Sequence, residues 1–425
     1  MVPTSRPAQL FVLTFFVLLV GSSTWAQQPL EPDQLPLSSA PSAQGRSAHV
    51  PPRLIGPNGA ATLAPGAASA TTTTTSTSID TVLTFSGSYL VGPSTARKKF
   101  FFTMVGHGPG FAGTTTLNAP IIPVSLDLRN ADGSPRFVNG HRLFYDVTPF
   151  IAQLLASPMF QNAHYSSSGR LTQFADAVQR AEFHSAASAW HTVLKPLVKT
   201  KRVMKLAAGS YKFALKKDGT CCAYVLVDSG TFNDELFPSS ASDRTSIAGQ
   251  ALHAGDIRTR DVTTFFFPNT FLTNPDSSFV FIGFHSFFSL PGTAQNGNRE
   301  QRFVMNFSSW VTPFVFFGDA FQDVTAVSHE LVELINDPFV DNITPWWKAP
   351  NGNCQNLLEP GDVLEDLPNA TFPVKTSGKT FHPQNEALLQ WFEFQKPSHA
   401  IAGAYSYPDE RLLMSLSRVE PPGCQ

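Results

Sequence analysis

Residues 323–336 read DVTAVSHELVELIN, and this stretch predicts an α-helix. Its apolar side chains recur at helical spacing, at Val324, Val327, Leu331 and Ile335. Side chains three and four residues apart form one stripe on an α-helix. At about 100° per residue, His329 and Glu333 fall on the other side of the cylinder. Pro338 ends the predicted helix, because proline cannot continue the backbone hydrogen-bond pattern.

His329, Glu330 and Glu333 give this helix the composition of a metal site. Residues i and i+4 lie on one helix face, so His329 and Glu333 can reach one zinc ion while Glu330 projects beside it toward a water molecule. Carboxylate and imidazole groups are both zinc ligands. The metalloprotease pattern is His-Glu-x-x-His, and this sequence departs from it at Glu333. The alternative interpretation is an ordinary solvated helix face, where glutamate is common.

The N-terminal segments are typical of an exported protein. Arg6 precedes an apolar run at 10–20, and small residues precede a plausible cleavage point after Ala26, so 1–26 is predicted to be a signal peptide. Segment 27–78 is rich in Pro, Ser, Thr and Ala, which predicts a disordered tether. These features predict a secreted or periplasmic protein without a membrane span.

The net charge narrows the possible binding partners. The formal net charge is −2 and the longest basic cluster is Arg97-Lys98-Lys99, so nucleic acid is not an expected partner.

Four cysteines in an exported chain predict two disulfides. Adjacent Cys221 and Cys222 are poorly placed to pair with each other. We therefore expect Cys354 to pair with one of them and Cys424 with the other.

The rest of the chain is predicted to be an α+β protein. Region 79–200 is strand-rich and contains a long helix predicted from 169 to about 194. Region 201–425 contains further strands that lead into the helix at 323–336 and forms the predicted metal-site domain. Strands followed by such a helix favour a mixed sheet packed on the metal-binding helix.

Three resemblances follow from these segments. Strands leading into a His-Glu helix resemble the zincin metalloprotease architecture, which implies that His329 and Glu333 bind zinc and that Glu330 is the general base. The chain is also similar to a set of uncharacterised secreted bacterial proteins. That similarity is carried by TQFADAVQRAEF at 172–183, IGFH at 282–285, SHELVE at 328–333 and CQNLLEPGD at 354–362. Plant phosphate-induced (Exordium-type) proteins share a weaker similarity to the His-Glu-x-x-Glu segment. These resemblances imply a fold and a metal, but no substrate.

A catalytic zinc site needs a third protein ligand. Glu359 is the first choice, because zincins with a glutamate ligand place it at a similar distance beyond the helix. Asp362 is an alternative, as a ligand or as the partner of an imidazole. Asp337 is also a candidate, although its position before Pro338 favours a role in a turn. His382 is predicted either to bind the metal or to stabilise the oxyanion formed at a scissile carbonyl.

Other histidine and tyrosine side chains are weaker candidates. His285 ends a predicted strand and is expected either to line a substrate groove or to be structural. Tyr405 and Tyr407 are candidate proton donors.

Two functions are consistent with these residues. The first is a secreted zinc-dependent hydrolase, most simply a metallopeptidase that acts on a peptide or protein substrate. The second is a non-catalytic extracellular module on a zincin-like scaffold, which binds a cell-surface polymer or another partner. A serine hydrolase is not indicated, because the chain has no Gly-x-Ser-x-Gly motif.

Overall fold

A computed structural model describes residues 31, 33–37, 45–46, 53–55, 61–63, 79–166, 169–184, 189–274 and 280–416. The predicted signal peptide and Cys424 lie outside these ranges. No helix in the described ranges is long and apolar enough to cross a membrane.

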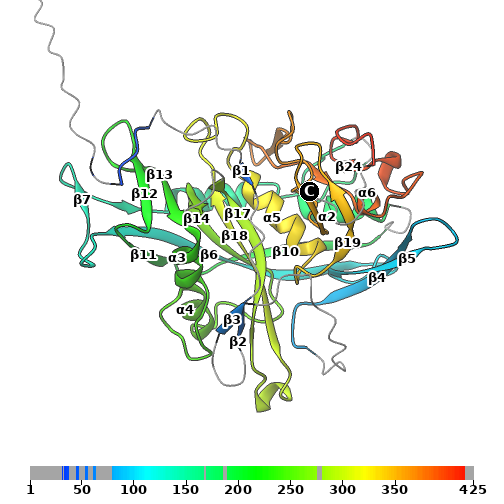
Figure 1. Cartoon of the computed structure of the whole chain (residues 1–425), viewed down its shortest axis with the longest axis horizontal. Coiled ribbons are helices and arrows are strands. Elements are labelled where there is room, and N and C mark those ends of the chain that lie inside the picture. Colours follow the sequence, from blue (N-terminus) through cyan, green and yellow to red (C-terminus); the bar gives the residue numbers. More distant parts are fainter. Residues whose placement is uncertain are drawn as a thin grey trace, which may run out of the picture.

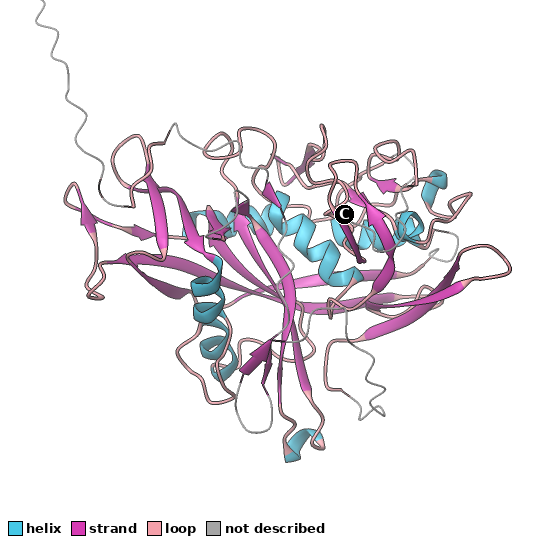
Figure 2. Ribbon diagram, viewed as in Figure 1, coloured by secondary structure: helices cyan, strands magenta, loops and turns pink. Residues whose placement is uncertain are grey.

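A large mixed sheet forms the centre of the protein (Figures 1 and 2). Its longest strand, β6 (Thr114–Arg129), pairs in parallel with β10 (His191–Val198) and β14 (Thr263–Pro268). Strand β14 pairs in parallel with β18 (Gln301–Trp310), and β17 (Gly283–Leu290) runs antiparallel to β18. The sheet thus combines parallel pairs with an antiparallel pair.

Further strands extend this sheet and form a second one. Strands β9 (Phe144–Tyr145) and β11 (Arg202–Ala207) also pair with β6. The second sheet has the order β1-β16-β15-β13-β12. Its strands are β1 (Gly45–Arg46), β12 (Tyr211–Leu215), β13 (Cys221–Asp228), β15 (Thr270–Thr273) and β16 (Val280–Phe281).

Other strands form two-stranded units. They are β4 (Thr84–Val91) with β5 (Lys98–Val105), β7 (Phe137–Val138) with β8 (His141–Arg142), β19 (Ile343–Lys348) with β20 (Cys354–Leu357), β21 (Val374–Thr376) with β22 (Lys379–Phe381), and β23 (Glu386–Ala387) with β24 (Ser406–Tyr407).

Short strands also occur within the segment expected to be a tether. Strand β1 pairs with β16, and β2 (Arg53–Ile55) pairs with β17 and with β3 (Ala61–Leu63). Backbone hydrogen bonds do not depend on apolar side chains, so the Pro- and Thr-rich composition gave no indication of these pairings.

Helices cover both faces of the large sheet (Figures 1 and 2). Helices α5 (Thr325–Asn336) and α2 (Phe174–Glu182) contact each other and pack on one face. Helices α3 (Ser229–Leu236) and α4 (Ile247–His253) pack on the other face. The shorter helical elements are α1 (Thr148–Ala156), α6 (Leu389–Phe392), η2 (Ala294–Asn296) and η3 (Ile401–Gly403).

Alternation along β17 decides which of its side chains face α5. Phe287 belongs to the core that contains Val327 and Leu331 of α5, whereas Phe284 and Phe288 belong to the core on the opposite face. Successive side chains of a strand point to opposite faces of the sheet. His285 therefore lies on the same face as Phe287, toward α5.

The predicted α+β class is confirmed, and the helix predicted at 323–336 is α5. The long helix predicted from 169 to about 194 is wrong in its length, because α2 ends at Glu182. Residues 191–194 instead begin strand β10, which pairs with β6 along its whole length. β-Branched Thr192 and Val193 suit this extended conformation.

The predicted disulfide pairing is also wrong. Cys221 and Cys222 form a disulfide with each other, and their Cα atoms lie 3.0 Å apart. The expectation was that adjacent cysteines are poorly placed to pair with each other. Cys354 is disulfide-bonded as well, and neither Cys221 nor Cys222 is its partner.

We predict that Glu393→Gln stabilises the protein at alkaline pH. Burial raises the pKa of Glu393 from 4.5 to about 7, so the folded state retains a proton that the unfolded state loses above its own pKa. The free energy of unfolding of the wild type should therefore fall as pH rises from 4.5 to about 7. The full effect is on the order of 3 kcal/mol.

Glutamine is neutral at every pH and removes this loss. Urea denaturation should show Glu393→Gln more stable than the wild type at pH 8, with a smaller difference at pH 5. A difference that does not change with pH would contradict the raised pKa.

Candidate metal centre

The centre is assembled from α5, strand β17 and the loop that follows β20. All residues of α5 are buried, including His329, Glu330 and Glu333. The polar face of the predicted helix is thus enclosed by protein, and the interpretation as a solvated face is wrong. Buried charged groups need charge partners or a metal ion.

His329, Glu333 and Asp362 converge with the spacing of ligands around one ion. His329 Nε2 lies 3.1 Å from Glu333 Oε2 and 3.5 Å from Asp362 Oδ1. Two ligands on tetrahedral zinc with bond lengths of about 2.0–2.1 Å lie roughly 3.3 Å apart. These three atoms are buried and form no hydrogen bond with the residues that the structure describes. The donor set therefore fits a divalent cation.

Gln384 fixes the orientation of the His329 ring. Its amide nitrogen Nε2 donates to the carbonyl oxygen of Gly361 at 2.7 Å, so its Oε1 is the atom that faces His329 Nδ1 at 3.2 Å. Oε1 can only accept a hydrogen bond, which places the proton of a neutral imidazole on Nδ1. Nε2 then directs its lone pair toward Glu333 and Asp362, as a metal ligand requires.

The carboxylate of Glu333 is held from one side by backbone amides. Its Oε1 accepts hydrogen bonds from the amides of Gly361 at 3.1 Å and Asp362 at 3.3 Å. Its Oε2 points the other way and lies 3.1 Å from His329 Nε2 and 3.3 Å from His285 Nδ1. The loop 360–362 thus positions Glu333 and supplies Asp362 to the same centre.

His285 brings two further carboxylates into the centre. Its Nδ1 lies 3.8 Å from Glu330 Oε2 and 3.7 Å from Glu359 Oε2. Potential ligand atoms of His285, Glu330 and Glu333 all lie within 4.8 Å of one another, and so do those of His329, Glu333 and Asp362. Glu333 belongs to both sets.

Two glycines let the backbone approach the centre closely. A Cβ atom on Gly361 would lie 2.4 Å from His329 Nδ1, and one on Gly283 would lie 2.5 Å from Glu330 Oε1. Both distances are below van der Waals contact, so a side chain at either position would displace a group of the centre.

We therefore expect Gly361→Ala to weaken metal binding by roughly 10–100-fold, the usual effect of disturbing a group that orients a ligand. Competition with a chromophoric chelator would measure the zinc affinity. Gly110→Ala is the matched control, because a Cβ atom there meets nothing within 4 Å. Equal affinities for Gly361→Ala and the wild type would contradict the observed position of the His329 ring.

The carboxyl groups of the centre have divergent pKa values. Burial raises the pKa of Glu330 to about 7, against the opposing charge of His329. Burial also raises the pKa of Glu359 and Asp362. Burial acts on Glu333 in the same direction, but the neighbouring imidazoles hold its pKa well below the ordinary value. Glu330 is thus suited to exchange a proton near neutral pH.

The other predicted site residues belong to neither set of potential ligands. The Nδ1 atom of His382 lies 2.8 Å from Asp323 Oδ2, near the start of α5. Asp337 accepts backbone hydrogen bonds from residues 341 and 342, which is the turn role considered for it. Tyr405 donates to the carbonyl oxygen of Gln395. Tyr407 is buried in the core that contains α5.

Sequence reasoning missed two residues of the centre, Gln384 and Glu386. Both carboxylate oxygens of Glu386 are buried without a hydrogen bond to the described residues, and its charge interacts with His329 and Glu333. Neither residue belongs to a recognisable motif. The position of His285 could have been predicted, because the alternation of side chains along its strand indicates which face of the sheet it occupies.

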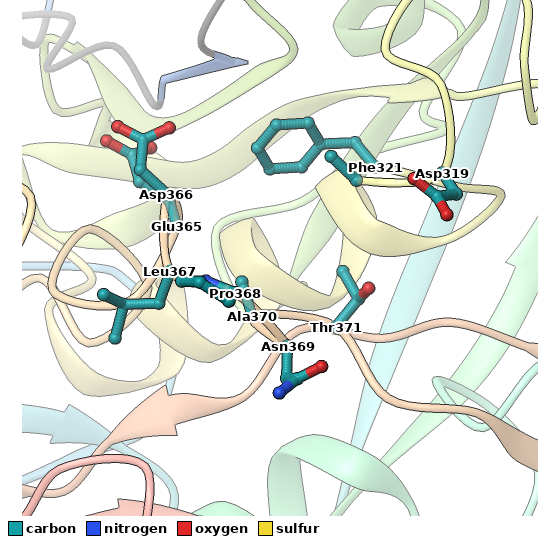
Figure 3. A pocket seen from close by; sticks show the side chains of 10 residues that line it. Asp319, Phe321, Glu365, Asp366, Leu367, Pro368, Asn369, Ala370 and Thr371 are labelled. Atoms are coloured by element: carbon teal, nitrogen blue, oxygen red, sulfur yellow. The ribbon is translucent and has the colours of Figure 1, made fainter.

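A pocket of about 470 Å³ lies beside the loop that carries Asp362. Figure 3 shows Glu365 and Asp366 on one side of this pocket and Asp319 and Phe321 on the other. Its lining also includes the apolar residues Leu367, Pro368 and Ala370. Three carboxylates next to apolar surface favour a ligand group that combines a positive charge with an apolar stem.

Comparisons with known proteins give no relative for this chain. No family model, no curated protein and no solved structure matches it. The function is therefore argued from the site alone.

Proposed function

We propose that the protein is a secreted, zinc-dependent hydrolase, most simply a metallopeptidase. The observation that carries this proposal is the convergence of His329 Nε2, Glu333 Oε2 and Asp362 Oδ1 at the separations expected around zinc. The helix that contributes the first two residues packs on a mixed sheet. This packing supports a zincin-like arrangement in which Asp362 takes the place of the third ligand and Glu359 lies beside His285.

The chemistry follows from the residues around the bound ion. His329, Glu333 and Asp362 would hold the zinc ion, which would polarise a carbonyl group and lower the pKa of a coordinated water. Glu330 accepts the proton of the attacking water as the new C–O bond forms at the peptide carbonyl. It then donates this proton to the leaving nitrogen as the C–N bond breaks. Hydrolysis thus delivers hydroxyl to the acyl product and hydrogen to the amine.

The acidic pocket suggests a substrate preference. Asp319, Glu365 and Asp366 favour peptides with lysine or arginine, whose side chains combine a long apolar stem with a positive charge. His382 remains a candidate for stabilising the oxyanion, and its hydrogen bond to Asp323 would orient its ring.

The proposal is tested by turnover of a peptide library with the mature chain. We expect cleavage that enriches for basic residues, is abolished by a zinc chelator and returns when zinc is added. Cleavage that persists in the metal-free protein would remove the metallopeptidase proposal.

Burial of the centre favours a second candidate function. The side chains of His285, His329 and Glu333 are at most 5% exposed. A structural ion that stabilises a non-catalytic module for a cell-surface polymer or partner protein suits such an enclosed site. Stoichiometric zinc without turnover of any library peptide would support this alternative.

A further inference from the structure

Glu333 stands between two imidazoles rather than beside one. Its Oε2 lies 3.1 Å from His329 Nε2 on one side and 3.3 Å from His285 Nδ1 on the other. The two imidazoles fall in different sets of potential ligands, and only Glu333 is common to both sets. Two ligands of one zinc ion are separated by at most about 4.2 Å, which is twice the bond length. Because His285 and His329 do not belong to one set of atoms within 4.8 Å of one another, one zinc ion cannot bind both imidazoles. The geometry therefore offers two cation positions.

The chemical composition of the second set supports such a position. It contains one imidazole and two carboxylates, from His285, Glu330 and Glu333. Their side chains are at most 4% exposed, and Glu333 Oε2 forms no hydrogen bond with the described residues. Glu359 adds a further oxygen, 3.7 Å from His285 Nδ1.

The surrounding charge also favours more than one cation. Buried carboxyl groups interact electrostatically throughout the centre; they belong to Glu330, Glu333, Asp337, Glu359, Asp362 and Glu386. The ion-pair partners described for this group are the imidazoles of His285 and His329, and an imidazole carries no positive charge when it binds a metal ion. A second divalent ion would offset more of this negative charge than one ion does.

We propose that the centre has a second, weaker cation position, formed by His285, Glu330 and Glu333, that regulates turnover. This inference rests on the proposed function, in which Glu330 is the general base. A cation at the second position binds the carboxylate of Glu330 and removes it from proton transfer. Excess zinc is then an inhibitor of the same centre that needs one zinc ion for activity.

The test is a zinc titration of the mature wild-type protein and of His285→Ala, followed by elemental analysis and by peptide turnover. We expect the wild type to bind two equivalents in two steps, and its turnover to fall by roughly 10²-fold during the second step, as general-base catalysis is lost. His285→Ala should bind one equivalent, and its own turnover should not fall as zinc rises. His382→Ala, which changes an imidazole outside both sets, should still bind two equivalents.

The outcomes separate this inference from the proposed function. No bound zinc in the wild type would remove both. One equivalent in both the wild type and His285→Ala would leave the hydrolase proposal intact and overturn the second position. In that case His285 is a hydrogen-bond donor to Glu333. Two equivalents without a change in turnover would overturn the regulatory role.

A spectroscopic measurement keeps the test independent of turnover and of the stability of the variant. The wild type loaded with manganese(II) should give an electron paramagnetic resonance spectrum of two coupled ions that share Glu333. A simple six-line spectrum at saturating manganese would contradict the second position. His285→Gln is the conservative variant if the alanine variant does not fold.

Discussion

Glu330→Gln is expected to lower kcat by roughly 10²–10⁴-fold, the usual contribution of a positioned general base. Glutamine has almost the same shape as glutamate but cannot accept the proton of water. His329, Glu333 and Asp362 are unchanged in this variant, so zinc between them should be retained. Turnover of a cleaved library peptide and elemental analysis of the same sample would measure both properties.

Glu393→Gln is the matched control, since it makes the same replacement at a largely buried glutamate outside the centre. Its turnover should equal that of the wild type. If Glu330→Gln keeps both its zinc and its full turnover, the catalytic role of Glu330 is wrong. If the variant loses its zinc, the loss of turnover is explained by the missing metal and not by proton transfer. Elemental analysis therefore shows which of the two explanations applies.

Removal of the metal is expected to destabilise the whole protein. Without a cation, the buried carboxyl groups near Glu333 repel one another or must take up protons. Binding to the folded state alone stabilises it by about 4 kcal/mol when free metal is 1,000 times the Kd. We therefore expect a chelator to lower Tm by several degrees and added zinc to restore it.

Glu333→Gln provides the control for this effect. The variant loses the carboxylate common to both ligand sets, so its Tm should respond little to a chelator or to zinc. Differential scanning calorimetry would give both values. An identical Tm for the wild type with and without a chelator, in protein shown to have contained zinc, would contradict the coupling between the centre and the fold.

Local sequence patterns predicted the part of the centre that lies on one helix. The spacing of Val324, Val327, Leu331 and Ile335 is a local property, and it placed His329 and Glu333 on one helix face correctly. The burial of that helix face could not be predicted from the same spacing. The loop 360–362 folds against this face and donates two amides to Glu333. Helical periodicity contains no information about such a loop.

Contacts between distant residues set the rest of the geometry. Asp362 and Glu359 are close in sequence, and both were considered as ligands. Asp362 lies beside His329 and Glu359 lies beside His285, and the loop 360–362 also contributes two amides that donate to Glu333. Gln384 orients His329 across 55 positions of sequence, and a lone glutamine carries no signal of that role.

Backbone conformation explains the errors elsewhere in the fold. The helix predicted through residue 194 failed because pairing with β6 decides the state of residues 191–198, and pairing outweighs local propensity. The disulfide prediction failed because it assumed that adjacent cysteines cannot pair. Both errors concern structure that side-chain patterns alone do not specify.

Anomalous X-ray diffraction at the zinc absorption edge would locate the metal ion that we propose is held by His329, Glu333 and Asp362. Crystals of the mature protein grown with zinc should show a strong anomalous peak about 2.0–2.2 Å from His329 Nε2 and from one oxygen of each carboxylate. Absence of a peak among these three side chains at saturating zinc would contradict the account.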